Sequence, residues 1–497
     1  MKAGSAAPRW TTLRDVLAAH AARDPDRPFL IAPETGRTLS YGEIERQAAN
    51  LARYLSLRGL RHGDRVALYL HNGYQATLLF LSAMIGGFVI VPLNLVAQRS
   101  QLAYVLGHCG ARLVFTSREN EAALAAALAE VKAKVDGIVI DPDAPELFIE
   151  KELPASKLEE VKATDAALLM YTSGTTGVPK GVVLTHANLM AGAASVARWH
   201  GLTPQDRCLS SLPLYHINGQ VIATLAPFVS GGSVIAPHRF SVSSWWPAAE
   251  AHGATWVNMV PTIVAYLLNA AGGERRRFPR IRFGRSASAP LAPDQHRAFE
   301  DAFGMPVIEC MGMTETASVC FANPQEGPRK IGSVGLPCGI EARVVDGEIQ
   351  LRGPNVMAGY YKSSDQTAAA FAPGGWLRTG DLGHCDAEGF YFITGRRKEL
   401  IIKGGENIAP REIDEALLRH PAVLEAAAVG IPDPAYGQEI RACVVLKDGA
   451  TLGVEELRTF CLAELGRYKT PREFIFLPEL PKGPSGKVQR LKLADVS

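Results

Sequence analysis

Apolar and polar positions follow two alternating periods along the first three hundred residues. Helical spacing over residues 41–59 is followed by short β-rich apolar runs at 65–70, 88–93 and 112–115. A second series of the same kind extends from about residue 187 to 307. Strands that alternate with helices form parallel sheets covered by helices. The pattern therefore predicts an α/β fold with two βαβ-type subdomains.

The pattern changes after Gly332. Short strands punctuated by glycine at 341–352 and 390–394 predict a smaller β-subdomain. The last hundred residues have a pattern of their own, with expected helices at 411–419 and 454–465 among expected strands, which is enough for a compact α+β domain. We expect a large N-terminal domain over residues 1–395 and a small C-terminal domain over 396–497.

Composition narrows the class of protein. At 497 residues the chain is long enough for about three domain-sized units, and 47% hydrophobic with 21% charged residues is typical of an ordinary soluble enzyme. A net charge of +2 gives no field that would attract nucleic acid. Eight cysteines without a Cys-x-x-Cys pair, and an N-terminus without an apolar signal region, predict reduced thiols in a cytoplasmic protein with no transmembrane segment.

Residues 171–181 carry the most specific chemical signal. Three glycines, four Ser/Thr hydroxyls and one lysine follow the apolar run 166–170. Glycine lets the backbone approach an anion, hydroxyls add donors, and Lys180 supplies a positive charge, so a strand leading into a loop around a nucleoside triphosphate is predicted. The spacing excludes a Walker loop, and no Gly-x-Gly-x-x-Gly motif opens a helix. A flexible surface loop would be the simpler interpretation if this segment stood alone.

Further motifs follow in order along the chain. They are Leu-Pro-Leu-Tyr-His-Ile-Asn-Gly at 212–219, Met-Gly-Met-Thr-Glu at 311–315, Gly-Glu-Ile-Gln-Leu-Arg-Gly at 347–353, Leu-Arg-Thr-Gly-Asp at 377–381, Gly-Arg-Arg-Lys at 395–398 and Pro-Ser-Gly-Lys at 484–487. Over almost its whole length the chain resembles the adenylate-forming superfamily of acyl-CoA synthetases, peptide-synthetase adenylation domains and beetle luciferases. Among the acyl-CoA synthetases, its sequence segments most resemble those of the oxalyl-CoA and small-acid synthetase branch.

The resemblance implies an ATP site and names its residues. Asp381 would take both ribose hydroxyls through its two oxygens, and Arg396 would be a second ribose contact. Met311 stands where the family usually has an aromatic residue stacked on adenine, and a thioether can also cover a ring. The implied ATP and AMP contacts are Thr172, Ser173, Gly174, Thr175, Thr176, Lys180, Ser288, Ala289, Pro290, Met311, Gly312, Met313, Thr314, Asp381 and Arg396.

The resemblance also implies the catalytic groups. Glu315 matches the magnesium ligand of the family, with Thr175 beside it, since Mg²⁺ needs only one or two carboxylates plus phosphate oxygens. Thr314 matches a hydroxyl on the α-phosphate. Lys487 matches the lysine that bridges the incoming carboxylate and the α-phosphate, where its long stem and point charge suit two anions. His216 would gate the acid pocket, although a satisfied core histidine is an equally good interpretation.

The remaining predictions concern the acid, coenzyme A and domain motion. The expected acid pocket contains the polar residues His216, Asn218, Asn258, Ser286 and Ser288 with Met313, which favours a short or polar acid. By resemblance the C-terminal domain is mobile and rotates about a hinge at Lys398, after which Gly404 and Gly405 border the tunnel for the pantetheine arm of coenzyme A. Asn218 departs from that branch, which often has a second histidine there.

The predicted reaction is ATP-dependent acyl-CoA synthesis through an acyl adenylate, with a carboxylic acid, ATP, Mg²⁺ and coenzyme A as the implied small molecules. Alternatives are an adenylation enzyme that loads an acyl carrier protein, a medium-chain, long-chain or aromatic acid–CoA ligase, and, more remotely, a luciferase-like oxygenase. A non-catalytic nucleotide-binding protein is disfavoured by Glu315, Asp381 and Lys487 together. A homodimer is possible.

Overall fold

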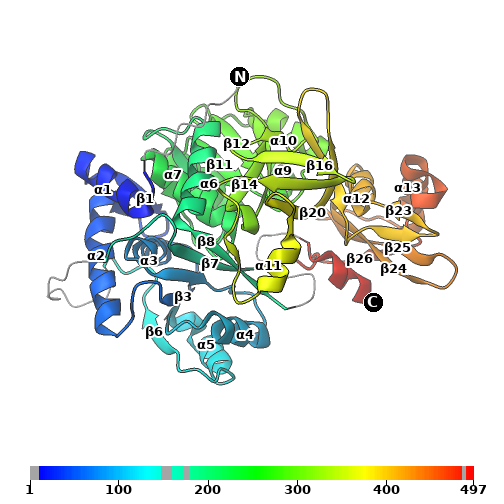
Figure 1. Ribbon diagram of the computed structural model, residues 1–497. Coiled ribbons are helices and arrows are strands. Elements are labelled where there is room, and N and C mark those ends of the chain that lie inside the picture. Colours follow the sequence, from blue (N-terminus) through cyan, green and yellow to red (C-terminus); the bar gives the residue numbers. More distant parts are fainter. Residues whose placement is uncertain (1–9, 147–158, 173–177, 484–487, 497) are drawn as a thin grey trace.

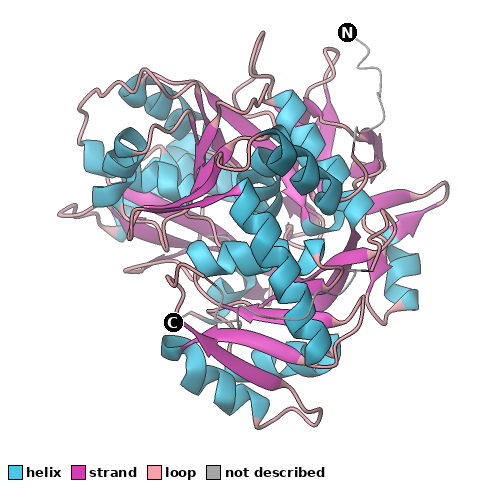
Figure 2. Cartoon of the chain, turned by 90° about the vertical axis from the view of Figure 1, so that its left-hand side faces the viewer, coloured by secondary structure: helices cyan, strands magenta, loops and turns pink. Residues whose placement is uncertain are grey.

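The computed structural model describes residues 10–146, 159–172, 178–483 and 488–496. These residues form four β-sheets with helices packed on their faces. Figure 1 shows the N-terminal sheets and helices, coloured blue to yellow, on one side and the orange and red C-terminal elements on the other. In the perpendicular view of Figure 2, helices flank the strands in both parts.

The first sheet has nine strands and carries most of the candidate site. Its central strands are parallel, and only β2, β14 and β15 pair antiparallel with their neighbours. In order across the sheet the strands are β15 (Leu336–Pro337), β14 (Ser318–Ala322), β13 (Val307–Met313), β12 (Phe283–Ser286), β11 (Trp256–Met259), β9 (Arg207–Leu209), β10 (Ser233–Ile235), β1 (Pro28–Ala32) and β2 (Arg37–Ser40).

Helices cover this sheet on both faces because each presents an apolar stripe to it. One hydrophobic cluster holds side chains of α8 (Val242–Ala251), α9 (Pro261–Ala271) and α10 (Pro293–Phe303). A second cluster holds side chains of α1 (Leu13–Arg23), α6 (His186–Trp199), α7 (Ala226–Ser230) and η2 (Asn218–Leu225). η2 is a π-helix, and the sequence analysis did not predict it. Helices of this type are rare overall, and those that occur often lie at functional sites.

The second sheet has seven strands and begins with parallel βαβ units. Its order is β18 (Gly359–Tyr360), β8 (Lys180–Thr185), β7 (Ala166–Thr172), β4 (Val89–Pro92), β3 (Arg65–Tyr69), β5 (Leu113–Ser117) and β6 (Asp136–Ile140). The accompanying helices are α2 (Tyr41–Leu57), α3 (Tyr74–Ile85), α4 (Arg99–Cys109), η1 (Arg118–Asn120) and α5 (Glu121–Leu128). All twelve residues of α3 are buried, as expected for a helix that is mostly apolar around its whole circumference.

The third sheet is the smaller β-subdomain. It contains β16 (Glu341–Val345), β17 (Glu348–Arg352), β19 (Phe371–Ala372), β20 (Trp376–Cys385) and β21 (Tyr391–Arg396), with η3 (Thr314–Thr316) and α11 (Ser364–Ala370) in the flanking chain. Asp346 and Gly347 turn the chain between β16 and β17 with φ of 50° and 75°, which is the Asp-Gly turn expected between paired strands.

The fourth sheet belongs to the C-terminal part and follows the turn at residues 397–400. Its elements are β22 (Ile401–Lys403), β23 (Glu406–Ile408), α12 (Pro410–Leu418), β24 (Val423–Asp433), β25 (Gly437–Leu446), α13 (Val454–Lys469), β26 (Glu473–Phe476) and η4 (Arg490–Asp495). It has its own hydrophobic core. A second apolar cluster joins Ala265 of α9 to Leu424 and Leu480, so the C-terminal part packs directly against α9.

The predicted fold class is confirmed. Every strand and helix expected in the C-terminal part is present within a few residues of its expected ends. The strand before the loop at 171–181 is β7, and the chain returns as β8, antiparallel to β7. All eight cysteines are free thiols. Within the described part of the chain, none of the helices combines the length and apolar character needed to span a bilayer.

Candidate functional site

A cavity of about 240 Å³ lies between the carboxyl ends of the N-terminal strands and the C-terminal part. Ligands in α/β proteins bind beyond the carboxyl ends of parallel strands, because loops from several strands converge there. The predicted nucleotide residues that line this cavity are Ser288, Ala289, Pro290, Met311, Gly312, Asp381 and Arg396. Motifs separated by more than a hundred residues in sequence therefore meet at one place.

A fixed carboxylate and guanidinium form one wall of the cavity. Asp381 on β20 lies directly across from Arg396 on β21, and Arg396 Nε is 2.7 Å from Asp381 Oδ1. Asp381 is only 3% exposed. The adjacent carboxylate raises the pKa of Arg396 against the opposing effect of burial. Two charges held by paired strands give a rigid recognition point for hydroxyl groups.

Met311 and Gly312 lie at the end of β13, beside this pair. Met311 lines the cavity with its thioether side chain. A side chain at Gly312 would clash with the backbone carbonyl of Ser318, so this position accepts only glycine. Met311 and Met313 both pack against the apolar cluster of the β-subdomain. Met313 does not line the 240 Å³ cavity, whereas Met311 does.

Glu315 is joined to the base of the 171–181 loop through Tyr360. The Tyr360 hydroxyl donates a hydrogen bond of 3.0 Å to Glu315 Oε1, and Lys180 Nζ lies 5.1 Å from the centre of the Tyr360 ring. Burial, and then the negative charge of Glu315, raise the pKa of Tyr360. Thr314 is buried beside Glu315. The sequence analysis did not single out Tyr360.

The loop itself is bounded by Thr172 and Lys180, which face each other across β7 and β8. Ser173, Gly174, Thr175 and Thr176 lie outside the described residues. The described part of the chain contains no group of three His, Cys, Asp or Glu side chains able to hold a metal ion by themselves. One carboxylate at Glu315 is a donor set that suits Mg²⁺ held together with phosphate oxygens.

A polar cluster lies behind Ser288, on the face of the first sheet that η2 covers. Asn218 Nδ2 donates to Ser288 Oγ at 3.1 Å, and Asn258 Nδ2 donates to Asn218 Oδ1 at 2.9 Å. Arg285 Nη1 donates to Asn258 Oδ1 at 3.1 Å and to Asn218 Oδ1 at 3.4 Å. We call Asn218, Asn258, Ser288 and Arg285 the polar cluster. Three of its members were predicted at the acid pocket.

Arg285 was not among the residues that the sequence analysis expected at the acid pocket, whereas Ser286, which was, follows Arg285 directly in β12. Arg285 pairs with Asn258 across the strands, whereas Ser286 pairs with Met259 and Glu309. Because successive side chains in a strand point to opposite faces, Ser286 lies on the face away from the polar cluster. The available signal for Arg285 was a charged residue within a strand whose four residues are all buried.

His216 lies just before η2 and is partly exposed. Its Nδ1 accepts a hydrogen bond from the backbone N–H of Asn218 at 3.3 Å. This contact ties His216 to the first turn of η2, next to the polar cluster. His216 does not line the 240 Å³ cavity within the described residues.

The C-terminal part closes the cavity from the other side. Lys482, Val488 and Arg490 line it, and Lys482 and Val488 form an antiparallel bridge. Arg490 is held by Asp414, whose Oδ2 is 2.6 Å from Nη2, and by Glu399 at 3.5 Å. Lys487 lies outside the described residues, but its neighbour Val488 borders the cavity.

The predicted coenzyme A and hinge residues do not line this cavity. Lys398 is exposed in the turn between β21 and β22. Gly404 and Gly405 form the next turn, with φ of 54° and 88° that favour glycine. The neighbouring Lys403 is buried, and its Nζ lies 2.7 Å from Glu439 Oε1. The arrangement thus presents Lys482 and Val488, and not the two glycines, to the predicted nucleotide residues.

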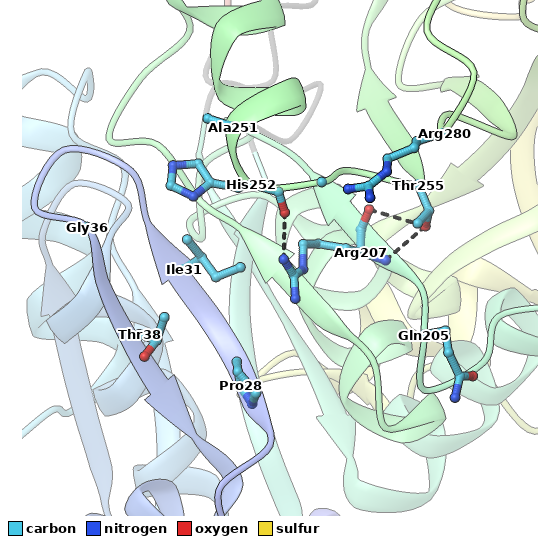
Figure 3. Close-up of a pocket in the computed structure, with 11 residues that line it drawn as sticks. Pro28, Ile31, Gly36, Thr38, Gln205, Arg207, Ala251, His252, Thr255 and Arg280 are labelled. Carbon is cyan, nitrogen blue, oxygen red and sulfur yellow. Dashed lines mark hydrogen bonds between the residues drawn. The ribbon is translucent and has the colours of Figure 1, made fainter.

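A larger cavity of about 590 Å³ opens at the amino ends of the same strands (Figure 3). There Arg207 Nη1 donates to the His252 carbonyl oxygen, and Arg280 lies nearby on the same side of the cavity. None of the motif residues lines this cavity within the described part of the chain. We assign the candidate active site to the smaller cavity, because the chemistry-bearing motifs meet there.

The chain is similar over nearly its whole length to known enzymes of one family. The sequence profile of the AMP-binding enzyme family matches residues 17–361, and that of the AMP-binding enzyme C-terminal domain matches residues 412–487. The chain is 54% identical to a sulfoacetate–CoA ligase of Cupriavidus necator over 501 residues, which covers 97% of each chain. It is 35% identical to an oxalate–CoA ligase of Arabidopsis thaliana, covering 96% of this chain and 97% of the relative.

A solved structure has the same fold over nearly the whole length. The o-succinylbenzoate coenzyme A synthetase MenE from Bacillus subtilis, in complex with ATP and a magnesium ion, superimposes with a TM-score of 0.83 at 32% identity. The match covers 96% of this chain and 98% of the other. The large N-terminal and small C-terminal parts described above are shared with that enzyme.

Proposed function

The chain belongs to the AMP-binding enzyme family, and from that premise we propose that it joins a short, polar carboxylic acid to coenzyme A. It is an ATP-dependent acyl-CoA synthetase. A carboxylate oxygen of the acid attacks the α-phosphorus of ATP, and the bond to the β,γ-phosphates breaks to release pyrophosphate. The thiolate of coenzyme A then attacks the acyl carbon, and AMP leaves as the acyl–oxygen bond breaks.

The observation that carries this proposal is the shared cavity. Asp381, Met311 and Ser288 of the N-terminal part line it together with Lys482 and Val488 of the C-terminal part. A nucleotide bound at Asp381 and an acid bound near Ser288 would be held side by side, which lowers the entropic cost of joining them. Lys487 follows directly in the chain before Val488, and its ammonium group would offset the repulsion between two anions.

We assign the nucleotide contacts as follows. Asp381 and Arg396 hold the ribose, Met311 covers adenine, and Thr314 contacts the α-phosphate. Ser288, Ala289, Pro290, Gly312 and Met313 would border the adenylate. Donors for the outer phosphates come from the loop residues Thr172, Ser173, Gly174, Thr175, Thr176 and Lys180.

Magnesium is assigned to Glu315 with Thr175. The hydrogen bond from Tyr360 fixes one oxygen of Glu315, which leaves the other oxygen for the metal. When bound, Mg²⁺ neutralises charge on the phosphates. The remaining work falls to the side chains of the chain, which bind and orient the two substrates and exclude water.

Domain alternation is the second part of the proposal. We place the boundary between residues 395 and 396 and the hinge at Lys398, in the turn that joins the third and fourth sheets. The observed arrangement suits adenylate formation, because the segment next to Lys487 faces the cavity. Rotation about Lys398 would replace it with Gly404 and Gly405, beside which a thin pantetheine arm can pass.

Several observations favour a short, polar acid. The polar cluster behind Ser288 would lose hydrogen-bond partners against an alkyl chain, at about 1–3 kcal/mol for each buried group. The similarity to a sulfoacetate–CoA ligase and to an oxalate–CoA ligase supports the same class of acid. His216, beside the first turn of η2, would gate this pocket.

Release of pyrophosphate across a panel of acids tests the proposal. Sulfoacetate, oxalate, malonate and acetate should give higher kcat/KM values than benzoate, octanoate and palmitate. A higher kcat/KM for palmitate would contradict a polar pocket. A second arm compares coenzyme A with a phosphopantetheinylated carrier protein as acceptor, and we expect turnover with coenzyme A. Analytical ultracentrifugation in the same buffer tests whether the enzyme forms a homodimer.

A further inference from the structure

Arg285 is a fully buried guanidinium without an acidic partner. It lies on β12 with 0% exposure. Its Nη1 donates only to the amide oxygens of Asn258 and Asn218, and its Nε has no acceptor among the described residues. Within the part of the chain that the structure describes, no carboxylate lies within 4.0 Å of this guanidinium. Native proteins rarely bury a charge in this way unless something offsets it.

The side chains around Arg285 do not supply a negative charge. Burial, and then the charges of Arg285 and Arg282, lower the pKa of His200 well below its ordinary value, so His200 is neutral. Burial also raises the pKa of Cys208, and that of Cys310 to about 11, even though Arg285 acts in the opposite direction. Both groups are therefore neutral thiols at physiological pH. The positive charge is uncompensated within its own surroundings.

Arg285 lies close behind the wall of the candidate active site. Ser288 borders the cavity, Asn218 hydrogen-bonds to Ser288, and Arg285 hydrogen-bonds to Asn218. The last of these contacts is 3.4 Å, at the long end for a hydrogen bond to nitrogen. Arg285 and Asn218 do not line the cavity, so the far end of an acid whose reacting carboxylate lies near Ser288 would reach Arg285 only by displacing the Asn218 amide. A ligand oxygen could there replace the weakly held amide oxygen of Asn218.

We propose that Arg285, supported by Asn218 and Asn258, binds the distal anionic group of a short acid that carries two negative charges. This inference rests on the proposed function and adds the charge of the acid to it. Arginine has five N–H donors in a planar fork, which matches the oxygens of a sulfonate or a second carboxylate. An acid without a second charge would leave the guanidinium without a counter-charge, so the site favours diacids over acetate, and over fatty acids more strongly.

The wild-type enzyme tests this with pairs of acids that share shape and differ in charge. Sulfoacetate is compared with methylsulfonylacetate, and malonate with its monoamide, by kcat/KM for pyrophosphate release. A charge-assisted hydrogen bond corresponds to about a 10- to 100-fold change in a binding constant. We expect the charged member of at least one pair to be favoured by at least about tenfold. Equal kcat/KM values within both pairs would overturn the proposal.

The variant Arg285→Met tests the residue itself. The ratio of the kcat/KM values of the two acids in a pair should fall to about one. The kcat/KM value drops for the acid with two charges and changes little for its analogue with one. Arg280→Met is the matched control, since Arg280 is exposed on the distant rim and should leave the preference unchanged. A folded Arg285→Met enzyme that keeps the wild-type preference would refute the assignment. Arg285→Lys, which retains the charge without the fork, should keep part of the preference.

A different set of results would contradict the proposed ligase function as a whole. If no acid in either pair, nor any in the wider panel, releases pyrophosphate, the proposed function itself is wrong. If both members of a pair are activated equally well, the ligase function stands and only the role of Arg285 is wrong. Comparison of ATP affinity between the wild type and Arg285→Met separates loss of the acid site from damage to the nucleotide site, and we expect the two affinities to agree.

Discussion

Replacing Glu309 by glutamine should remove a pH dependence of stability that the fold has built in. Glu309 lies on β13, is 1% exposed and borders the nucleotide cavity. One of its oxygens accepts a hydrogen bond from the backbone N–H of Leu291 at 3.2 Å, and the other has no partner among the described residues. Burial raises the pKa of this carboxyl from 4.5 to about 7, although the charge of Arg411 acts in the opposite direction.

The sign follows from proton binding in the two states. Between pH 4.5 and 7 the folded carboxyl keeps a proton that the unfolded chain has lost, so the free energy of unfolding falls as pH rises through this range. Each pKa unit corresponds to about 1.4 kcal/mol, which makes the full effect roughly 3 kcal/mol and the part between pH 5 and 8 about 2–3 kcal/mol. Glutamine resembles the protonated carboxyl in shape and does not titrate. Glu309→Gln should therefore gain about 2–3 kcal/mol relative to wild type between pH 5 and pH 8.

Urea unfolding at pH 5, 6, 7 and 8 measures this difference. Fluorescence of Trp245 and Trp246 is a suitable signal, because both lie in the hydrophobic cluster that also contains Leu291. A constant difference between Glu309→Gln and wild type across this range would show that Glu309 titrates as an ordinary carboxyl, and the reasoning from burial would be wrong.

Glu300→Gln is the matched control because the pKa of Glu300 moves the other way. Burial opposes the change, but hydrogen bonds from His296, the Val307 backbone N–H and Arg329 lower the pKa of Glu300 to about 2. The ionised Glu300 carboxylate therefore stabilises the folded state by about 3 kcal/mol above pH 4.5, and this contribution is lost as pH falls toward 2. Glu300→Gln should therefore be destabilised by a nearly constant amount from pH 5 to 8.

Four further substitutions test the assigned roles. Lys487→Ala should abolish adenylate formation but spare thioester formation from supplied acyl-AMP, and equal loss in both half-reactions would refute its role. Lys398→Pro should impair the second half-reaction selectively, since proline fixes φ at the proposed hinge; intact transfer to coenzyme A would contradict domain rotation. Asp381→Ala should weaken ATP binding by about 1.5–3 kcal/mol for each lost charge-assisted bond, measurable by calorimetry, and an unchanged affinity would place the ribose elsewhere. Met311→Tyr should preserve or improve ATP binding, and a severe loss would show a pocket shaped around the thioether.

Local patterns in the sequence determined the fold class, and the family resemblance of short motifs pointed to several residues that line the 240 Å³ cavity. Helical and strand periods are local properties, so the βαβ series and the elements of the C-terminal part could be predicted from neighbouring residues. Motif residues such as Asp381 and Arg396 could also be found, because each lies in a short distinctive run. The strand pairing that holds them 2.7 Å apart then follows from β20 and β21 being consecutive.

Only the tertiary structure decided which side chains meet behind that cavity. Asn218 and Ser288 are 70 residues apart, and no local pattern indicates that they touch. Ser286 and Ser288 have the same residue type and alternate in the manner of a strand, but Ser288 adopts φ of 74° after β12 has ended. This left-handed residue breaks the alternation, so Ser288 faces Asn218 while Ser286 stays on the opposite face.

Arg285 is the clearest case. The sequence shows Arg285 shortly after two other arginines and before two serines, a context that is compatible with a surface position. Its burial depends on β11, β13 and η2, which enclose it from three separate parts of the chain. The energetic consequence, a positive charge surrounded by neutral groups, exists only once these elements have packed, because it is the exclusion of water that makes the charge need a partner.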